Sequence, residues 1–405
     1  MSYPHARRRL KRLVTLATAG AILSLTATAC ASSSTNSAST AAKSAPAGCS
    51  SPSGATGPGA GATTIGFIYV GSTSDYGYNE AAHAGAMALK KECPNLKILE
   101  ADEIPETSQM ATVAQQMIAE GAKVIFSTSY GYESYAVNLA KKYPQVAFLQ
   151  QGNYITPPLP DNLNTFFGSV YETEYMAGIA AGLATKTGKL GFVMGFPIPQ
   201  TLLDADVFEL GAQSVNASVK TYLTFTDNWC DPAKQADEAN TLLEQGVDVL
   251  TQYQDCQTAV IKAAAAKGAD VVGYHYDAQA LDPTGWLTGS EWNWGPLYEA
   301  MVKSILAGKF AGSQFNTDYS LGFAGSKTIP SPMDLAAFGP SVSASTKTLI
   351  ANVKAKVLGG WSPFTGPIYN QSGKLEVKAG QVPTAEQLDS LNFLVKGVVG
   401  TLPSS

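Results

Sequence analysis

The chain has 405 residues, of which 45% are hydrophobic and 15% are charged, and its formal net charge is −5. This length is more than one small core requires and is typical of two domains or two lobes. An acidic chain without a basic patch argues against nucleic acid as a partner.

The first 30 residues have the features of an export signal rather than of a folded domain. "ARRRLKR" is basic, and the apolar run "LVTLATAGAILSL" that follows is too short for a comfortable membrane span. The segment ends in "TATAC", which resembles a bacterial lipobox, so Cys30 is the expected lipidation site. An ordinary signal peptide with a chance cysteine is the alternative, and "RRRLK" leaves both Sec and twin-arginine export open.

Residues 31–62 are small, polar and rich in Gly and Pro. Such a segment buries too little apolar surface to offset its chain entropy, so we expect a flexible tether. Lipid and tether together place the globular body on the extracytoplasmic face of the cell membrane, where disulfides form. The expected strand topology favours the pairs Cys49–Cys93 and Cys230–Cys256, and free cysteines are the alternative.

From Thr63 onward, short apolar runs alternate with amphipathic stretches. This alternation predicts parallel strands that are covered by helices on both faces of a sheet. The expected strands are 64–70, 96–101, 123–128 and 146–150, and the expected helices are 78–92, 107–120, 131–142 and 171–185.

A second series of elements begins near residue 188 and echoes the first. Its expected strands are 189–195, 219–225, 247–253 and 269–275, and its expected helices are 203–216, 232–245 and 256–267. Further helices are expected at 295–307, 343–357 and 384–395. We therefore predict an α/β fold with two doubly wound parallel-sheet lobes joined by several crossovers. Lobe 1 is expected to hold 63–187 with about 318–342, and lobe 2 to hold 188–317 with about 343–398.

Polar and aromatic residues recur where the expected strands end. Parallel sheets bind ligands at the carboxyl ends of their strands, and flat side chains from two closing lobes can sandwich a flat ligand. A tyrosine at a strand end is as often a packing residue, so the prediction depends on the recurrence. The candidate ligand-binding residues are Asp75, Tyr78, Asn79, Tyr130, Gln151, Trp229, Asp255, Asp277 and Trp294.

The sequence offers little for catalysis. His5 lies in the signal segment and His83 inside a predicted helix, so only His275 lies near a strand end. No spacing indicates a nucleophile with its base, a zinc site or a Walker loop. We therefore expect neither an enzyme nor a bound cofactor or metal.

Several motifs follow one another along the chain: "GFIYVGSTSDYGYNEAAHAGA", "STSYGY", "YETEYMAGIAAG", "FELGAQSVN", "NWCDPAK", "GYHYDAQALDP" and "WNWGPLYEAMVKSILAGKF". In this order they resemble the basic membrane protein family of substrate-binding lipoproteins, which serve ABC transporters and include purine nucleoside receptors. The resemblance implies a type I periplasmic-binding-protein fold. It also implies a monomer that captures a purine-like molecule for a membrane permease and its ATPase.

By this resemblance, Tyr78 stacks on the ligand and Asn79 reads its edge. Trp229 lies near the opposing aromatic residue of the family, and Asp277 matches an acidic residue that contacts the ligand. Gln151 stands where relatives often have a histidine. The first loop is shorter than in nucleoside receptors and lacks their early aspartate, which favours a free base such as adenine. The open alternatives are a sugar or another polar molecule in the same cleft, and a surface enzyme that processes nucleosides.

Overall fold

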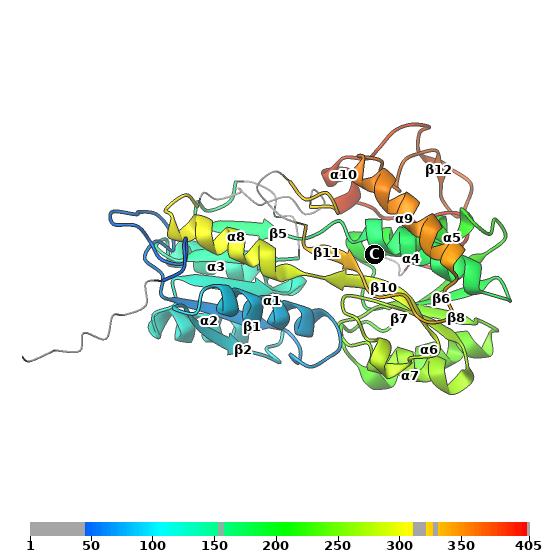
Figure 1. Cartoon of the computed structure of the whole chain (residues 1–405), viewed down its shortest axis with the longest axis horizontal. Coiled ribbons are helices and arrows are strands. Elements are labelled where there is room, and N and C mark those ends of the chain that lie inside the picture. Colours follow the sequence, from blue (N-terminus) through cyan, green and yellow to red (C-terminus); the bar gives the residue numbers. More distant parts are fainter. Residues whose placement is uncertain (1–44, 153–154, 156–157, 311–320, 327–330, 403–405) are drawn as a thin grey trace, which may run out of the picture. The chain divides into compact units, whose positions relative to one another are not determined.

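A computed structural model describes residues 45–152, 155, 158–310, 321–326 and 331–402. Cys30 and the predicted export signal lie outside the described residues. Within the described part, none of the helices combines the length and the apolar character that crossing a membrane requires. Two parallel sheets organise the residues from 63 onward, as Figure 1 shows.

The first sheet has the strand order β2-β1-β3-β4-β5, with all neighbours parallel. Side chains of β1 alternate between its two faces, so Ile65, Phe67 and Tyr69 pack toward one helical layer and Ile68 toward the other. Its strands are β1 (Thr64–Tyr69), β2 (Lys97–Ala101), β3 (Val124–Thr128), β4 (Ala147–Gln151) and β5 (Leu163–Phe166).

Four helices and a short 3-10 turn, η1, accompany the first sheet. Helices α2 and α3 cover one face, while α1 and α8 pack against each other on the opposite face (Figure 1). We call this sheet with its helices lobe 1. The elements are α1 (Tyr78–Glu92), α2 (Ser108–Ala119), η1 (Tyr130–Tyr132), α3 (Glu133–Lys142) and α8 (Trp294–Leu306).

The second sheet has the order β11-β10-β9-β8-β6-β7-β14, and only the pairing of β11 with β10 is antiparallel. Helices α6 and α7 cover one face, and α4 and α5 cover the other. The strands are β6 (Lys189–Met194), β7 (Lys220–Phe225), β8 (Val249–Tyr253), β9 (Asp270–Gly273), β10 (Trp286–Trp292), β11 (Met333–Leu335) and β14 (Val398–Val399). The helices are α4 (Tyr171–Ala184), α5 (Pro199–Gln213), α6 (Pro232–Glu244) and α7 (Thr258–Lys267).

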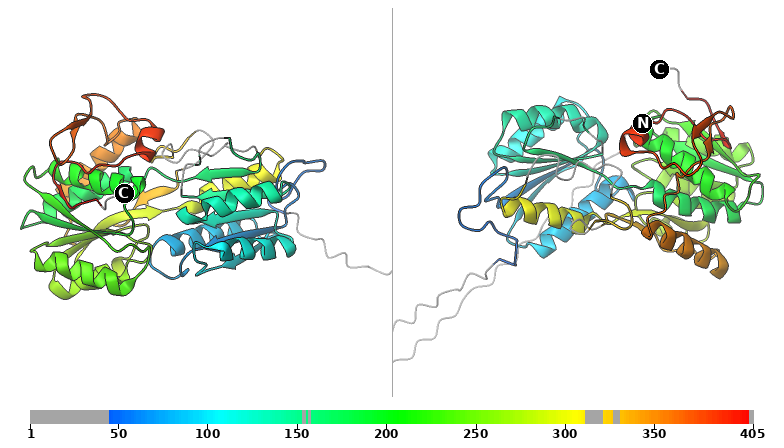
Figure 2. Two further views of the ribbon diagram at one scale, coloured as in Figure 1. Left: turned by 180° about the vertical axis from the view of Figure 1, so that it is seen from behind. Right: turned by 90° about the horizontal axis from the view of Figure 1, so that it is seen from above.

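The C-terminal segment completes this second unit, lobe 2. Helix α9 packs on α4, α10 packs on α5, and both lie on the same side of the lobe in Figure 2. The Val395 amide donates a hydrogen bond of 2.8 Å to the buried Asp206 carboxylate of α5, which ties the segment down. Its elements are α9 (Ala344–Leu358), β12 (Ile368–Tyr369), β13 (Leu375–Val377) and α10 (Ala385–Asp389).

The predicted lobe boundaries need three corrections. Helix α4 packs on α5 and β10, so lobe 2 begins before residue 171 rather than at residue 188. Helix α8, expected in lobe 2, packs on α1 in lobe 1, whereas β11, expected in lobe 1, extends the second sheet. The hydrophobic periodicity predicts helices and strands but not their partners, and for this reason the crossovers were misplaced.

Both expected disulfides are present, and one of them corrects the predicted tether. Cys49 bonds to Cys93 at the end of α1, and Cys230 bonds to Cys256 in lobe 2. Cys49 is fully buried, and the Gly59 amide donates to the Gln145 carbonyl at 2.9 Å. Residues 45–62 therefore pack against lobe 1 and are not part of a flexible tether.

Helices α4 and α5 approach closely and bury several acids. A Cβ atom at Gly178 would lie 2.1 Å from the Phe208 carbonyl oxygen, so only glycine allows this backbone contact.

Glu209 accepts hydrogen bonds from Thr221 at 2.7 Å and Gln213 at 2.6 Å. Burial raises the pKa of Glu209 to about 7, and that of Glu172 to about 7. It also raises the pKa values of Glu174, Asp204 and Asp206.

These raised pKa values predict that the protein is more stable in mild acid than at alkaline pH. In the unfolded chain a glutamate titrates near about 4.3, so the folded state binds more protons between about pH 4 and pH 7. This stabilisation is complete below the unfolded pKa and is lost as the pH rises through about 7. Thermal unfolding should show a Tm several degrees higher at about pH 5.5 than at about pH 8. Glu209→Gln should flatten the profile, and a Tm that rises toward alkaline pH would contradict the prediction.

Candidate functional site

A cavity lies between the two lobes at the carboxyl ends of their strands, where doubly wound sheets bind ligands. Its empty space, including its open side, is about 310 Å³. Five aromatic rings dominate its walls, together with a serine hydroxyl, a glutamine amide, a carboxylate and a glycine backbone. We call it the ligand pocket; its residues are Tyr78, Ser129, Tyr130, Gly152, Phe167, Gln200, Trp229, Tyr253 and Asp255.

The ligand pocket unites residues from both lobes. Tyr78 begins α1 and Tyr130 begins η1 in lobe 1, whereas Trp229 follows β7 and Tyr253 ends β8 in lobe 2. Gln200 of α5 donates through Nε2 to the Gly152 carbonyl across the pocket. Of the nine predicted residues, Tyr78, Tyr130, Trp229 and Asp255 therefore line the pocket.

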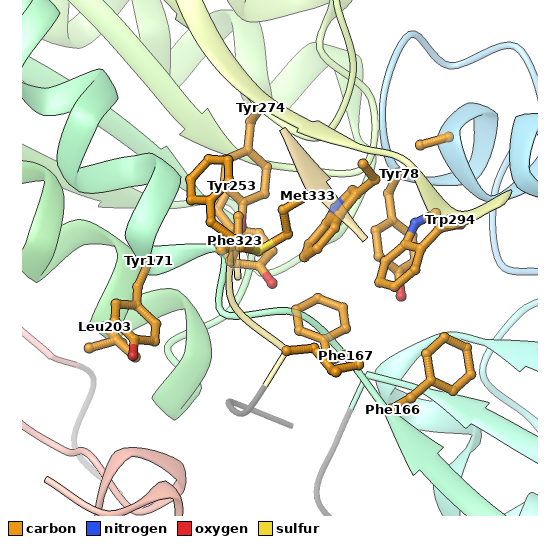
Figure 3. Close-up of a cluster of buried hydrophobic side chains, with 14 of the residues drawn as sticks. Tyr78, Phe166, Phe167, Tyr171, Leu203, Tyr253, Tyr274, Trp294, Phe323 and Met333 are labelled. Carbon is orange, nitrogen blue, oxygen red and sulfur yellow. The ribbon is translucent and has the colours of Figure 1, made fainter. Parts of the chain in front are cut away.

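A stack of aromatic side chains supports the pocket from behind. Trp294, predicted to bind ligand, is buried and stacks on Trp292 at 4.5 Å and on Tyr298 at 5.9 Å between ring centroids. Figure 3 shows Trp294 beside Tyr78, with Phe167 below them. Trp294 is not among the residues that line the pocket and instead packs on one that does, Phe167, at 6.1 Å between ring centroids.

His275 lies in the same aromatic cluster, against two pocket residues. Its ring meets Tyr78 at 5.1 Å and Tyr253 at 5.2 Å, and its Nδ1 accepts a hydrogen bond from the Trp292 indole at 2.5 Å. Burial lowers the pKa of His275, so the ring is neutral and the proton is on Nε2. In the described part of the chain this Nε2 has no hydrogen-bond partner.

Asp75 organises the first loop rather than the pocket. Its carboxylate accepts hydrogen bonds from the amides of Gly77 at 2.8 Å, Asn79 at 3.2 Å and Glu80 at 3.0 Å. These are the free amides at the start of α1, which a carboxylate satisfies well. Burial raises the pKa of Asp75 to about 6, although its hydrogen bonds oppose the shift.

Asn79 was predicted to read the edge of the ligand, but the protein itself uses its side chain. The Asn79 Oδ1 accepts from the Gly71 amide at 3.1 Å, and Nδ2 donates to Asp75 at 2.8 Å and Asp255 at 3.4 Å. The side chain is fully buried and does not line the pocket. Its position therefore favours a role in joining the two lobes.

Gln151 and Asp277 also lie outside the pocket lining. The Gln151 Oε1 accepts from the Tyr298 hydroxyl at 2.6 Å, so the side chain belongs to the core behind β4. Asp277 caps the turn η2 (Gln279–Leu281) by accepting from the Gln279 amide at 3.0 Å. A residue can follow a strand end and still point away from the cleft, because the direction of a loop is not encoded in hydrophobic periodicity.

Five pocket residues were missed by the sequence analysis: Ser129, Gly152, Phe167, Gln200 and Tyr253. Ser129 and Tyr253 lie at expected strand ends but were not chosen as candidates. Phe167 follows β5, a strand that the apolar pattern did not reveal. Gln200 lies in the first turn of α5, which begins at Pro199 rather than at residue 203. Proline at the first position of a helix was the available signal for Gln200. Gly152 directly follows β4 and carries no chemical signal of its own.

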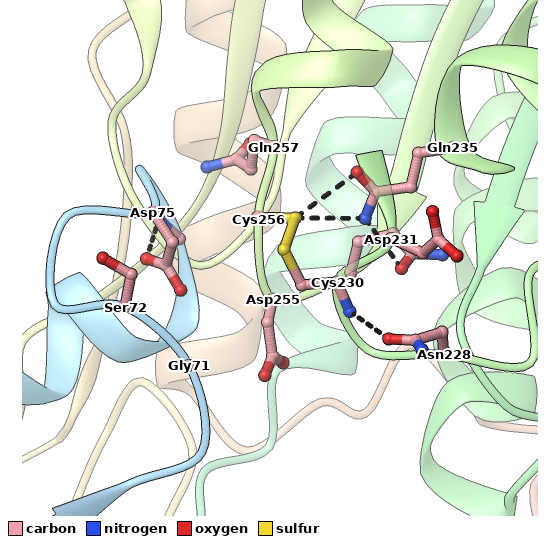
Figure 4. The surroundings of a disulfide bond; sticks show 12 residues. Gly71, Ser72, Asp75, Asn228, Cys230, Asp231, Gln235, Asp255, Cys256 and Gln257 are labelled. Carbon is pink, nitrogen blue, oxygen red and sulfur yellow. Dashed lines mark hydrogen bonds between the residues drawn. A yellow bond between two sulfur atoms is a disulfide. The ribbon is translucent and has the colours of Figure 1, made fainter. Parts of the chain in front are cut away.

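A second, more open cavity adjoins the ligand pocket and shares Trp229 and Asp255 with it. We call it the outer cavity. Its empty space, including its open side, is about 970 Å³. Cys230 lies on its wall, and Figure 4 shows the disulfide to Cys256 between Asn228 and Asp255. The disulfide therefore joins the two loops that present Trp229 and Asp255.

The loop 75–79 of lobe 1 docks on the loop 255–257 of lobe 2. The Tyr78 amide donates to the Asp255 carbonyl at 3.0 Å, and the buried Gln257 side chain donates to the carbonyl of Tyr76. Gln257 also accepts from the Tyr274 amide at 2.7 Å within lobe 2. We call this contact the clasp; it holds the lobes together beside the pocket.

No group of three or more His, Cys, Asp or Glu residues in the described part of the chain is arranged to hold a metal ion. The pocket offers aromatic faces and a few hydrogen-bonding groups, which is an arrangement suited to binding.

Comparison with known proteins agrees with this geometry. The family model described as "ABC transporter substrate-binding protein PnrA-like" matches residues 62–322. A purine-binding protein of Brucella abortus is 32% identical over 84% of this chain and 93% of its own length. A Haloferax volcanii ABC transporter protein named for glucose binding is 28% identical over 86% of this chain and 83% of its own length. An ABC transporter solute-binding protein of Aeropyrum pernix has the same fold, with a TM-score of 0.62 at 19% identity over 81% of this chain and 95% of its own.

Proposed function

Because this chain belongs to the family of PnrA-like ABC transporter substrate-binding proteins, we propose that it captures a purine base or nucleoside between its lobes. The observation that carries the proposal is the aromatic lining of the ligand pocket. Tyr78 of lobe 1 and Trp229 of lobe 2 both line the pocket, and we propose that their rings stack on the faces of a flat ring system. Stacking of this kind stabilises a bound base by about 1–3 kcal/mol per aromatic side chain.

The polar groups of the pocket suit the edge of a purine. The Asp255 carboxylate accepts hydrogen bonds from ring or exocyclic N–H groups. The Gln200 amide can donate or accept, whereas the Ser129 hydroxyl, which donates to Glu106, can accept. Asn79, Asp255 and Asp277 were all expected to satisfy the edge of the ligand, and we propose this role for Asp255 alone, because it is the one of the three that lines the pocket. The similarity to the Brucella abortus purine-binding protein over nearly its full length supports the same ligand class.

We further propose that the protein delivers its ligand to an ABC permease without converting it. Closing of two lobes around a ligand gives the permease a shape that reports occupancy. Residues 1–30 resemble a lipoprotein signal, so lipidation at Cys30 would keep the protein on the extracytoplasmic face of the membrane. A nucleoside-processing enzyme is disfavoured because the pocket lining contains no histidine, cysteine or lysine.

Isothermal titration calorimetry with the mature protein tests the ligand class. Adenine, guanine, adenosine and guanosine should be compared with glucose at equal concentrations. We expect saturable binding of at least one purine and no binding of glucose. Glucose is included because the aromatic walls and the Haloferax relative suggest a sugar as the alternative ligand. Binding of glucose alone would overturn the proposal. Release of free base from a nucleoside during the titration would instead show an enzyme.

A further inference from the structure

Two carboxylates from opposite lobes meet in the clasp. The Asn79 amide nitrogen donates to Asp75 Oδ2 at 2.8 Å and to Asp255 Oδ2 at 3.4 Å. Only 8% of Asp75 and 5% of Asp255 is exposed. One amide group of lobe 1 therefore bridges an acid of its own lobe and an acid of the other.

Among the described residues, no lysine, arginine or histidine is hydrogen-bonded to either acid, although three amides at the start of α1 donate to Asp75. From lobe 1, Glu106 acts on Asp255, and the Glu80 carboxylate accepts from the Tyr76 amide at 2.8 Å beside Asp75. Glu103 lies on the wall of the outer cavity, Tyr78 and Tyr253 line the ligand pocket with Asp255, and the Asp255 charge acts on the phenols of Tyr132 and Tyr253. No lysine, arginine or histidine lines either cavity in the described part of the chain.

Docking of the loops is what brings the two acids together. The bonds from the Tyr78 amide to the Asp255 carbonyl and from the Gln257 amide to the Asp75 carbonyl, at 3.0 and 3.4 Å, exist only when the lobes touch. When the lobes separate, each carboxylate faces water and is free of the other. Two neighbouring carboxylates in a buried contact repel each other, and binding of a proton by one of them removes this repulsion.

We propose that closing of the lobes takes up a proton at the Asp75–Asp255 pair, so that closure and protonation reinforce each other. This inference goes beyond the proposed function. It rests on that function in one respect, namely that the closed lobes are the form that holds the ligand. A cell-surface protein would thereby hold its ligand more firmly in acidic surroundings and release it more readily in alkaline ones.

The sign follows from the titration of the two acids. Burial raises the pKa of Asp75 to about 6, and burial together with the Asp75 charge raises the pKa of Asp255. In separated lobes both acids are hydrated and titrate near about 4. The closed form therefore binds more protons than the open form. For each proton taken up, the equilibrium constant for closure rises by up to about tenfold per pH unit of acidification, between the pKa of the closed form and that of the open form.

The distance between the lobes, measured by fluorescence energy transfer, tests the proposal without a choice of ligand. Dyes at Lys141→Cys on α3 and Lys262→Cys on α7 report the separation in the mature, disulfide-bonded protein; both native lysines are exposed. We expect the closed fraction to increase severalfold between about pH 7.5 and pH 5.5, both without ligand and with subsaturating adenine. Asp255→Asn, which mimics the neutral acid, should reduce this increase strongly.

Glu209→Gln is the matched control, since Glu209 is a buried acid of lobe 2 with a pKa near 7 that lies outside the clasp. It should keep the pH dependence of closure while changing that of thermal unfolding. A closed fraction of the wild type that does not change with pH would overturn the proposal, and so would an unchanged slope in Asp255→Asn. If no purine binds, the proposed function fails, yet the ligand-free measurement still decides this inference.

Discussion

Replacement of Gly77 by alanine is expected to weaken ligand binding by about 100-fold or more while leaving each lobe folded. A Cβ atom at this position would lie 1.9 Å from the Asp255 carbonyl oxygen in the opposite lobe. Its nearest neighbour in its own lobe would be Asp75 Oδ1 at 3.7 Å, an ordinary contact. The added methyl group therefore obstructs only the docking of the two lobes.

The size of this effect follows from the population of the closed form. A ligand held between two lobes binds tightly only in the closed arrangement, so its apparent affinity falls by the factor by which that population falls. The clash involves backbone on the far side, which cannot move aside as a flexible side chain can. A displacement of the loop by more than 1 Å would also break the hydrogen bond from the Tyr78 amide to Asp255.

Calorimetry with the best purine ligand and small-angle X-ray scattering check this prediction together. Gly77→Ala should retain the Tm of the ligand-free wild type. When purine is added, its scattering profile should remain that of open lobes, whereas the wild type should become more compact. Ser74→Ala is the control, because this exposed serine lies in the same loop and makes no contact with lobe 2 among the hydrogen bonds of the described residues. Normal affinity in Gly77→Ala would mean that the clasp is not needed to hold the ligand.

The sequence allowed the fold to be predicted well because each layer has its own periodicity. The predicted strand 64–70 became β1, which ends one residue earlier at Tyr69, and the predicted helix 78–92 coincides with α1. Gly, Pro and polar residues mark the ends of these elements, so their bounds were also predictable. The partners of α8 and β11 depend on tertiary packing across a crossover, which no local pattern encodes.

The candidate site was predicted in part for a related reason. Strand ends converge in a parallel sheet, so Tyr78, Tyr130, Trp229 and Asp255 could be placed near one another from the sequence. Whether a side chain at a strand end faces the cleft or the protein depends on two or three loop dihedrals. Asn79 illustrates this, since its amide faces two carboxylates and a backbone amide instead of the pocket. Phe167 was missed because the strand before it, β5, was not predicted, and Gln200 was missed because α5 begins earlier than predicted.

Trp229→Ala should lower the affinity for the purine by roughly 10- to 100-fold, which corresponds to about 1–3 kcal/mol of lost stacking. The ring of Trp229 lines both cavities and is held edge-on by Phe196, at 4.8 Å between ring centroids. It is thus a fixed aromatic surface of lobe 2 at the mouth of the pocket. Calorimetry with the same ligand measures the loss.

The backbone at this position separates a loss of stacking from a loss of structure. The Trp229 carbonyl accepts from the Asp255 amide at 2.7 Å, and the disulfide from Cys230 to Cys256 fixes the same loops, so both contacts persist in Trp229→Ala. Trp229→Phe, which keeps an aromatic face, should recover most of the affinity. Trp361→Ala removes an exposed tryptophan that packs on Tyr175 and should bind normally. Equal losses in the alanine and phenylalanine variants would mean that the indole positions the loop and does not stack on the ligand.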